Sequence, residues 1–393
     1  MRFSDFLNNE RLNEGGNVYV TNRKGESSFA DQIDLQKFHV LEFREQFLKL
    51  FSELNKLYQR KFNKEKLWSS DSDIRSGLVF NGSTSYIMNP EISHEEILKY
   101  KKKAGDVDIM IPKDSMRNLW ILLKSLEEER IAGFTYFGNN RNDISKLGTQ
   151  INAIFVYHHK EGDIKCQVDF EASDFENGKP TEWSKFSHGS SFEDAKSDIK
   201  ALHHKLLLRS LVGAISRNPE ILIATPKSTP DKITIKKNSE VARMAQFSVD
   251  YGLGFGLKPL LDSNGEQVFY DGKAVWLEKE QKEKEYINNL DKIFEYIFKM
   301  KIAPKSFYSF KGIVSLMKKY CDNDTIRYTH ERYFETLWGK GGQVIDSFSP
   351  ENDCKIKLNG FNYFLDSLNL KHPLLDKEIQ KYYDARKSAF RKL

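Results

Sequence analysis

The chain has 393 residues, enough for two or three domains with a sizeable core. Its 61 lysine and arginine residues against 56 aspartate and glutamate residues give a net charge of only +5, so overall charge does not indicate a nucleic-acid partner and only local clusters could. No apolar run approaches the roughly 20 residues that a membrane-spanning helix needs, so we expect no membrane partner.

Cysteine usage and the first residues predict a cytoplasmic protein. The three cysteines, Cys166, Cys321 and Cys354, lack metal-ligand spacing and cannot all pair, which is typical of a reducing compartment. The first five residues do not begin a signal peptide. Cys166 falls in a predicted strand, where we expect it to be a core residue rather than a reactive thiol.

The N-terminal region is predicted to contain an irregular arm and one helix. Residues 1–28 have the glycine- and asparagine-rich character of an exposed arm. Residues 33–62 carry phenylalanine and leucine at helical intervals among charged residues, which predicts an amphipathic helix. Aromatic stripes at this spacing usually belong to a core, so we expect this helix to pack on the following sheet.

A short apolar run and a small-residue turn come next. Residues 78–80 predict a buried strand, and Gly82 allows a tight turn in which backbone N–H groups approach an anion. Ser83 and Ser85 add hydroxyls that can donate to phosphate oxygens. Such turns are also common in loops that bind nothing, so this one is informative only in combination with other residues.

Two aspartates alternate with β-branched residues in the next strand. Because side chains at i and i+2 share a face, Asp106 and Asp108 point the same way, and Ile109 can be buried on the other side. Neighbouring carboxylates raise each other's pKa unless a cation compensates, and hard cations such as Mg²⁺ prefer oxygen ligands. The pair alone could equally be an exposed strand end. A second such pair, Asp71 and Asp73, lacks apolar alternation and predicts a solvated turn or helix cap.

A third carboxylate lies on a predicted hairpin formed by residues 151–157 and 164–170. Val168 and Phe170 share one face of its second strand, and Asp169 lies on the other. Asp169 beside the earlier pair would complete a cluster able to hold two metal ions. Glu171 is a rival for this role, although its simplest interpretation is a solvent-facing strand residue.

The order Gly82-Ser83, then Asp106-x-Asp108, then Asp169 resembles the nucleotidyltransferase fold of the DNA polymerase beta superfamily, over about residues 70–211. The resemblance implies an α+β fold with a mixed sheet flanked by helices. It implies that Gly82 and Ser83 contact the triphosphate of an NTP and that the aspartates bind two Mg²⁺ or Mn²⁺ ions. Asp169 would bind the catalytic ion and help to activate the attacking hydroxyl.

The interval between the turn and the aspartate pair departs from the family. It spans 22 residues between Ser83 and Asp106, where the family usually has far fewer, so residues 89–105 read as an insertion. Pro90 and Gly105 bracket this insertion as turn signals. Its lysine run, residues 101–103, either meets an incoming polyanion or is a solvated loop.

A basic helix is predicted after the third aspartate, over residues 191–217, with Ser191 as its N-cap. Lysines recur at helical spacing on it, and Lys200 and Lys205 are the leading candidates to neutralise the triphosphate. An ordinary solvated helix face explains the same spacing.

The remaining chain is less regular. Residues 225–230 predict an exposed loop, and residues 252–256 a flexible glycine-rich connection. The other expected elements are strands at 247–251 and 267–270, a helix at 277–301, and mostly helical structure over 305–393. Aromatic residues stand among basic ones in this last region, a mixture that suits either a core or base stacking.

These patterns predict three parts: an arm and helix at 1–69, a catalytic domain at 70–217, and a mixed, then mainly helical domain at 218–393 that could bind the acceptor. The expected activity is metal-dependent transfer of an NMP from an NTP to an acceptor hydroxyl with release of pyrophosphate. The C-terminal region slightly favours an RNA 3′ end as acceptor, and a protein or small-molecule acceptor is an open alternative. A second alternative is a non-catalytic nucleotide- or nucleic-acid-binding protein on a degenerate transferase fold.

Overall fold

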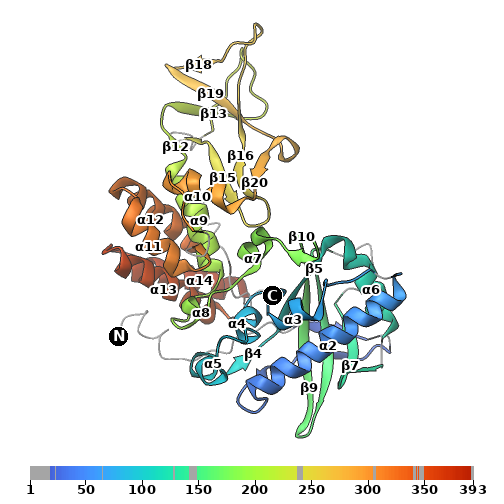
Figure 1. Ribbon diagram of the computed structural model, residues 1–393. Coiled ribbons are helices and arrows are strands. Elements are labelled where there is room, and N and C mark those ends of the chain that lie inside the picture. Colours follow the sequence, from blue (N-terminus) through green and yellow to red (C-terminus); the bar gives the residue numbers. More distant parts are fainter. Residues whose placement is uncertain are drawn as a thin grey trace. The chain divides into compact units, whose positions relative to one another are not determined.

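The computed structural model describes residues 18–22, 24–63, 65–126, 129–140, 148–236, 242–303, 307–339, 342, 344 and 349–390. Most of the predicted N-terminal arm, residues 1–17, lies outside this part of the chain. The described residues form a mixture of helices and strands, as the predicted α+β class requires (Figure 1). They pack into two compact units, with the boundary between Ser197 and Asp198, whereas the sequence predicted boundaries after residues 69 and 217.

The first unit is built on a five-stranded mixed sheet with the strand order β5-β9-β8-β7-β6. Strands β5 and β9 are parallel, and the other neighbours are antiparallel. The hairpin of β8 and β9 confirms the prediction and is longer than predicted at both ends. The strands are β5 (Val107–Pro112), β6 (Arg130–Ile131), β7 (Phe134–Asn139), β8 (Gln150–His159) and β9 (Gly162–Ser173).

Helix α2 (Val40–Lys61) runs across one face of this sheet, as the sequence predicted (Figure 1). Its Phe47 and Phe51 contact Phe134 and Phe170 of the sheet, with ring centroids 5.1 and 6.5 Å apart. The predicted start at residue 33 is wrong. Ile33 and the next residue form a strand, β3 (Ile33–Asp34), because they pair with β4 (Lys103–Ala104).

The short elements around the sheet change two further expectations. Residues 78–80 are not a buried strand, since Leu78 is exposed and only Phe80 forms a bridge, to Ile109. Asp73 is not solvated, because it is buried and accepts hydrogen bonds from the hydroxyls of Ser69 and Ser70 at the start of α3. The remaining elements of this unit are β1 (Tyr19–Thr21), β2 (Ser27–Phe29), α3 (Asp71–Arg75), α4 (Thr84–Ile87), α5 (His94–Tyr100), η1 (Lys113–Ser115), α6 (Met116–Ser125), β10 (Phe175–Glu176), β11 (Lys179–Pro180), α7 (Glu182–His188) and α8 (Phe192–Ala195).

The second unit combines a helical bundle with small sheets. Its later part is mostly helical as predicted, and Phe310 and Tyr333 are buried there, so these aromatic residues belong to a core. The helices are α9 (Leu202–Ile215), α10 (Leu290–Phe298), α11 (Phe310–Tyr320), α12 (Asn323–Trp338), α13 (Pro350–Ser367) and α14 (Leu375–Phe390). The other elements are β12 (Arg217–Asn218), β13 (Ile221–Ala224), β14 (Ala242–Arg243), β15 (Ala245–Ser248), β16 (Gly252–Phe255), β17 (Leu257–Pro259), β18 (Phe269–Tyr270), β19 (Lys273–Glu278), η3 (Gln281–Glu283) and β20 (Glu285–Ile287).

Three predictions for this region are wrong. The helix at 191–217 is broken between α8 and α9, where Asp198 has a φ of +53°. The helix at 277–301 exists only as α10, because the residues before it pair as strands β19 and β20. The glycine run at 252–256 is largely strand β16, which lies between β15 and β20 instead of forming a loose connection. In the last two cases strand pairing with distant residues overrides local preference.

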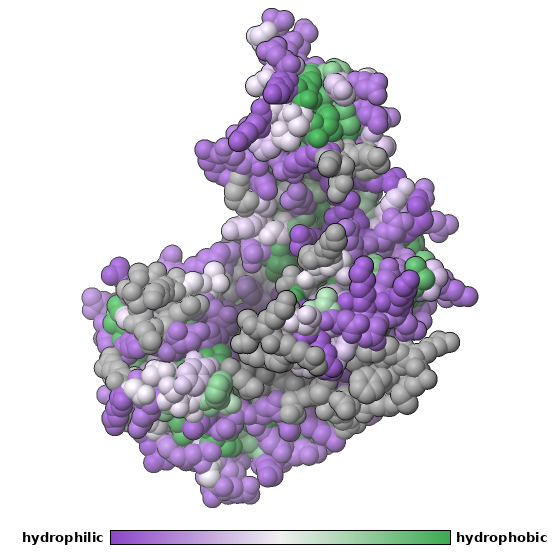
Figure 2. Space-filling model, turned by 180° about the vertical axis from the view of Figure 1, so that it is seen from behind, coloured by the Kyte–Doolittle hydropathy of each residue, from purple (hydrophilic) through white to green (hydrophobic). Residues whose placement is uncertain are grey.

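The surface is predominantly polar. Figure 2 shows one face of the molecule as mostly hydrophilic, with hydrophobic residues in small patches. Exposed apolar side chains such as Leu261, Phe269 and Tyr270 lie near the strands β17 to β19. None of the described helices combines the length and apolar character that crossing a bilayer requires.

Candidate metal centre

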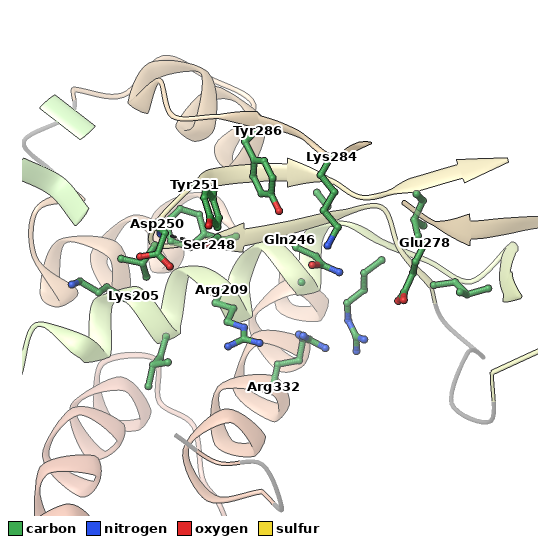
Figure 3. Close-up of a pocket in the computed structure, with 18 of the residues that line it drawn as sticks. Lys205, Arg209, Gln246, Ser248, Asp250, Tyr251, Glu278, Lys284, Tyr286 and Arg332 are labelled. Carbon is green, nitrogen blue, oxygen red and sulfur yellow. Dashed lines mark hydrogen bonds between the residues drawn. The ribbon is translucent and has the colours of Figure 1, made fainter. Parts of the chain in front are cut away.

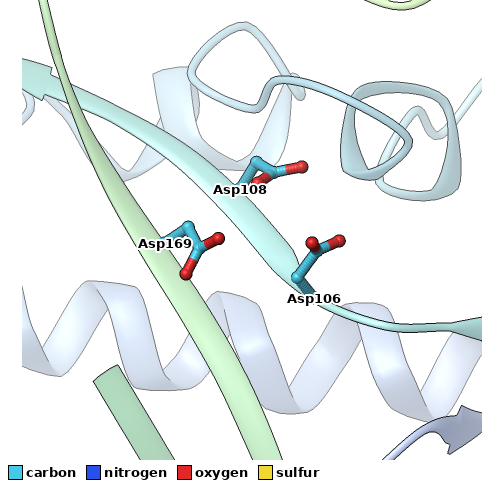
Figure 4. A group of neighbouring side chains, drawn as sticks. All are labelled: Asp106, Asp108 and Asp169. Carbon is cyan, nitrogen blue, oxygen red and sulfur yellow. The ribbon is translucent and has the colours of Figure 1, made fainter. Parts of the chain in front are cut away.

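The structure brings the three predicted aspartates together on the face of the sheet opposite α2. Asp108 and Asp169 are direct neighbours across the parallel strands β5 and β9, and Asp106 lies just before β5. Each of the three carboxylates offers an oxygen that lies within 4.8 Å of the others (Figure 4). Val168 and Phe170 are buried on the α2 side, which is the strand phase that the sequence predicted.

The small-residue turn that contains Gly82 is hydrogen-bonded to strand β5. The backbone N–H of Asn81 donates to the carbonyl of Asp108 at 3.2 Å. The backbone N–H of Asp108 donates in turn to the hydroxyl of Thr84, at 3.0 Å. On its other side the turn is held by the N–H of Gly82, which donates to the carbonyl of His188 at 3.2 Å. Hydrogen bonds therefore connect the turn directly to the strand that carries Asp108.

Gly82 is required in this assembly for two reasons. Its φ of +48° lies in the left-handed region, which is strained for residues with a side chain. A Cβ added at this position would also overlap Oδ2 of Asp108. The absence of a side chain thus lets the backbone of the turn lie directly against one carboxylate of the cluster.

The two predicted serines differ in their surroundings. Ser83 is half-buried at the start of α4 and makes no capping hydrogen bond to that helix. The hydroxyl of Ser85 donates to the carbonyl of Gly82 at 2.8 Å, so it supports the turn from inside. We therefore expect Ser83, more than Ser85, to meet a bound phosphate.

The carboxylates are electrostatically strained. The pKa of Asp108 lies well above its usual range, first because burial removes water and then because Asp106, Glu171 and Asp169 carry like charge. Lys101, from the predicted insertion, acts in the opposite direction and favours the ionised form of Asp108. At least one lysine of the run therefore lowers the pKa of a carboxylate in this cluster.

Asp169 is the most deeply buried of the three, with 4% of its surface exposed. Burial raises its pKa to about 7, and the charges of Asp106 and Glu171 act in the same direction. Hydrogen bonds from the side-chain amides of Asn152, at 2.8 Å, and Gln167, at 2.9 Å, partly oppose this shift and fix the orientation of the carboxylate. A divalent cation would relieve the remaining strain.

The rival carboxylate, Glu171, lies on the same face of β9, two residues beyond Asp169. It is not the solvent-facing residue that the sequence predicted. Glu171 accepts a hydrogen bond from the side-chain amide of Asn81, and its Oε2 lies 3.2 Å from Nδ1 of His188. Both partners hold Glu171 beside the turn. Its charge acts on the cluster, but Glu171 is not one of the three clustered aspartates.

Lys200 and Lys205 belong to the second unit, beyond the boundary at residue 198. Their predicted role toward a triphosphate stays a prediction. Lys205 lines a separate pocket within the second unit.

Sequence analysis missed several residues that build this centre. Asn152 and Gln167 had a usable signal, because they lie on the same face of predicted strands as Asp169. Thr84 lies inside the Gly-Ser segment, whose pattern indicates phosphate binding and not a hydrogen bond to β5. His188 had no signal, since its contact depends on the path of α7 back to the turn.

The donors of this centre are all carboxylate oxygens, which suit a hard cation such as Mg²⁺ or Mn²⁺. Asn81 has a buried side-chain oxygen, Oδ1, with no hydrogen-bond partner among the residues that the structure describes. Comparison with models of protein families, with curated proteins and with solved structures found no match to this chain. The geometry of the centre is therefore the main indication of function.

Proposed function

We propose that this protein is a metal-dependent nucleotidyltransferase with a fold like that of the DNA polymerase beta superfamily. The observation that carries the proposal is the convergence of Asp106, Asp108 and Asp169 beside a glycine turn packed against Asp108. Carboxylate clusters of this kind hold the two metal ions of many phosphoryl-transfer sites. The mixed sheet, with its parallel β5–β9 pair, supports the same proposal.

The reaction would join an acceptor hydroxyl oxygen to the α-phosphorus of an NTP and break the bond to the β-phosphate, so that pyrophosphate leaves. Bound metal ions would lower the pKa of the hydroxyl and stabilise the leaving pyrophosphate. The protein contributes orientation: Asn152 and Gln167 hold the carboxylate of Asp169 in place through hydrogen bonds. Because its pKa is about 7 in the metal-free protein, Asp169 can release its proton and bind a cation at neutral pH.

The turn would supply the triphosphate contact. Gly82 leaves room beside Asp108 because it has no side chain, and Ser83 follows it at the start of α4. A metal-bound triphosphate carries negative charge that the hydroxyl of Ser83 can bind. The acceptor is an RNA 3′ end in our leading form of the proposal, and a protein or small-molecule hydroxyl is the alternative.

The direct test is pyrophosphate release from each of the four NTPs with Mg²⁺ or Mn²⁺, with and without RNA. We expect metal-dependent release that Asp106→Asn/Asp108→Asn abolishes. Asp163→Asn is the matched control, because Asp163 is an exposed carboxylate on β9 outside the cluster, and it should retain activity. If the wild type and the double variant release pyrophosphate equally with every NTP and acceptor, the proposal is wrong.

A further inference from the structure

The second unit contains a pocket that the proposed catalytic centre does not use. Helices α9 and α12 and strands around β15 and β20 enclose a cavity of about 810 Å³ (Figure 3). This volume lies in the range that small-molecule sites occupy, about 300 to 1,000 Å³. All of its lining residues belong to the second unit, so its geometry does not depend on how the two units are placed.

The charge of this pocket is strongly positive. Six lysine and arginine side chains line it, against two carboxylates, Asp250 and Glu278. Glu278 is paired with one of these lysines, because its Oε2 lies 2.6 Å from Nζ of Lys236, so five cationic side chains remain against Asp250. The whole chain carries only +5, so this is a local concentration of positive charge of the kind that attracts anions.

Three guanidinium groups form the centre of this charge. Arg209 comes from α9, Arg243 from β14 and Arg332 from α12, and Figure 3 shows Arg209 and Arg332 directed into the same space. The pKa of Arg332 falls to about 10, chiefly because of burial and then because of the positive charge of Arg243. Glu335 opposes this effect and Arg209 adds to it. The protein thus holds like charges together in a partly buried site.

Arg332 also has an unfilled hydrogen-bonding position. Its Nε is buried and has no hydrogen-bond partner within the described residues. The guanidinium lies against Gly213 of α9, where an added Cβ would overlap Nε. A glycine therefore makes space for an arginine whose Nε has no hydrogen-bond partner among the described residues. Guanidinium groups bind phosphate through paired, charge-assisted hydrogen bonds, and a bound phosphate would offset the repulsion among the three arginines.

Two tyrosines provide an aromatic wall. The rings of Tyr251 and Tyr286 are in contact, with centroids 5.1 Å apart, and Tyr251 is 53% exposed. Both residues line the pocket (Figure 3). Exposed aromatic faces beside basic groups are the combination that stacks nucleobases while cations neutralise their phosphates.

We propose that this pocket binds a nucleoside phosphate, either free or as one unit of a single-stranded nucleic acid. Arg209, Arg243 and Arg332 bind the phosphate, and Tyr251 stacks on the base. This binding does not require the carboxylate centre and does not rest on the proposed transferase activity. Lys205 also lines this pocket.

The test uses the full chain in EDTA, so that metal-dependent binding at the carboxylates does not contribute. The probes are ATP, inorganic triphosphate and a short 5′-labelled oligoadenylate, followed by calorimetry or fluorescence anisotropy. We expect Arg209→Gln and Arg332→Met to weaken binding of ATP or of the oligonucleotide by about tenfold or more, the usual range for hydrogen bonds to charged groups. Arg209 is exposed, so its replacement should leave folding intact.

Arg327→Gln is the matched control. Arg327 is exposed on the same helix, α12, and is paired with Asp324 outside the pocket, so its loss should leave binding unchanged. Tyr251→Ala should weaken binding of ATP and of the oligonucleotide but not of inorganic triphosphate.

The two sources of the ligand are separated by competition and salt. A nucleic-acid site binds the oligonucleotide more tightly than ATP and loses affinity with salt by a logarithmic slope of about 0.7 for each phosphate contact. A free-nucleotide site prefers ATP. The proposal is overturned if the wild type binds none of these probes in EDTA, or if Arg209→Gln binds them as tightly as the wild type.

Discussion

Replacing Asp169 with asparagine should stabilise the metal-free protein at alkaline pH, although it removes a residue of the proposed active centre. The pKa of Asp169 rises from 3.8 to about 7 in the folded protein. At 1.36 kcal/mol for each pKa unit, keeping this carboxylate ionised costs the folded state about 4 kcal/mol above pH 7. An amide cannot accept all the hydrogen bonds from Asn152 and Gln167, which costs about 1 kcal/mol, so the expected net gain is about 3 kcal/mol.

The pH dependence has a definite sign. Because the folded-state pKa is raised, the folded protein binds the proton more tightly than the unfolded chain between pH 4 and 7. The metal-free wild type therefore loses stability from this group as the pH rises through that range, and the loss is complete above about pH 7. The asparagine variant lacks this loss, so its advantage should grow by roughly 1.4 kcal/mol for each pH unit and then level off.

The assay is urea unfolding in EDTA from pH 5 to pH 8, with Asp163→Asn as a control for substitution on β9. Mg²⁺ added at pH 8 should stabilise the wild type and give little or no stabilisation to Asp169→Asn, since the cation compensates the carboxylates. The reasoning is refuted if Asp169→Asn is less stable than the wild type at pH 8, or if their difference does not change with pH.

Two further substitutions test the turn at Gly82 and the buried ion pair of the second unit. Gly82→Ala should lower the free energy of unfolding by about 1–2 kcal/mol, because alanine is strained at this positive φ. It should also weaken the apparent affinity for Mg²⁺, measured from Mg²⁺-dependent stabilisation, by about tenfold or more, because the new Cβ displaces Asp108. Gly265→Ala is the control for backbone strain alone, since Gly265 has a positive φ and open space around it. Nζ of Lys357 lies 3.1 Å from Oδ2 of Asp353, and both side chains are buried. Asp353→Ala should lower the free energy of unfolding in urea by about 3–5 kcal/mol, because it leaves the charge of Lys357 buried without its partner. Adding Lys357→Met to that variant should restore most of the loss, and a double variant no better than the single one would contradict this account.

The carboxylate cluster could be predicted because strand phase is a local property. Alternation of apolar and polar residues fixes the face of each side chain, so Asp108 and Asp169 could each be assigned to a polar face before any pairing was known. The parallel pairing of β5 and β9 then placed them side by side. Periodicity alone does not predict this pairing. It depends on the order of strands in the sheet, in which β9 lies between β5 and β8.

Helix limits were predicted poorly where the decisive interactions are distant. Helical spacing over residues 191–217 is genuine, yet Asp198 adopts a left-handed conformation and the two compact units divide there. Residues 277–289 have the glutamate and lysine content of a helix, but β19 pairs with β13 and β17, and β20 with β16. Strand pairing of this kind supplies hydrogen bonds that local propensity cannot anticipate.

The two candidate sites share one physical feature, which is that each holds like charges together in a partly buried place. In the first unit the charges are carboxylates, and their raised pKa values measure the strain. In the second they are guanidinium groups, with the pKa of Arg332 lowered to about 10. Folding alone does not favour such clusters, so ligands of opposite charge give the simplest reason for them. In the first site the ligand of opposite charge is a cation, and in the second it is a phosphate group.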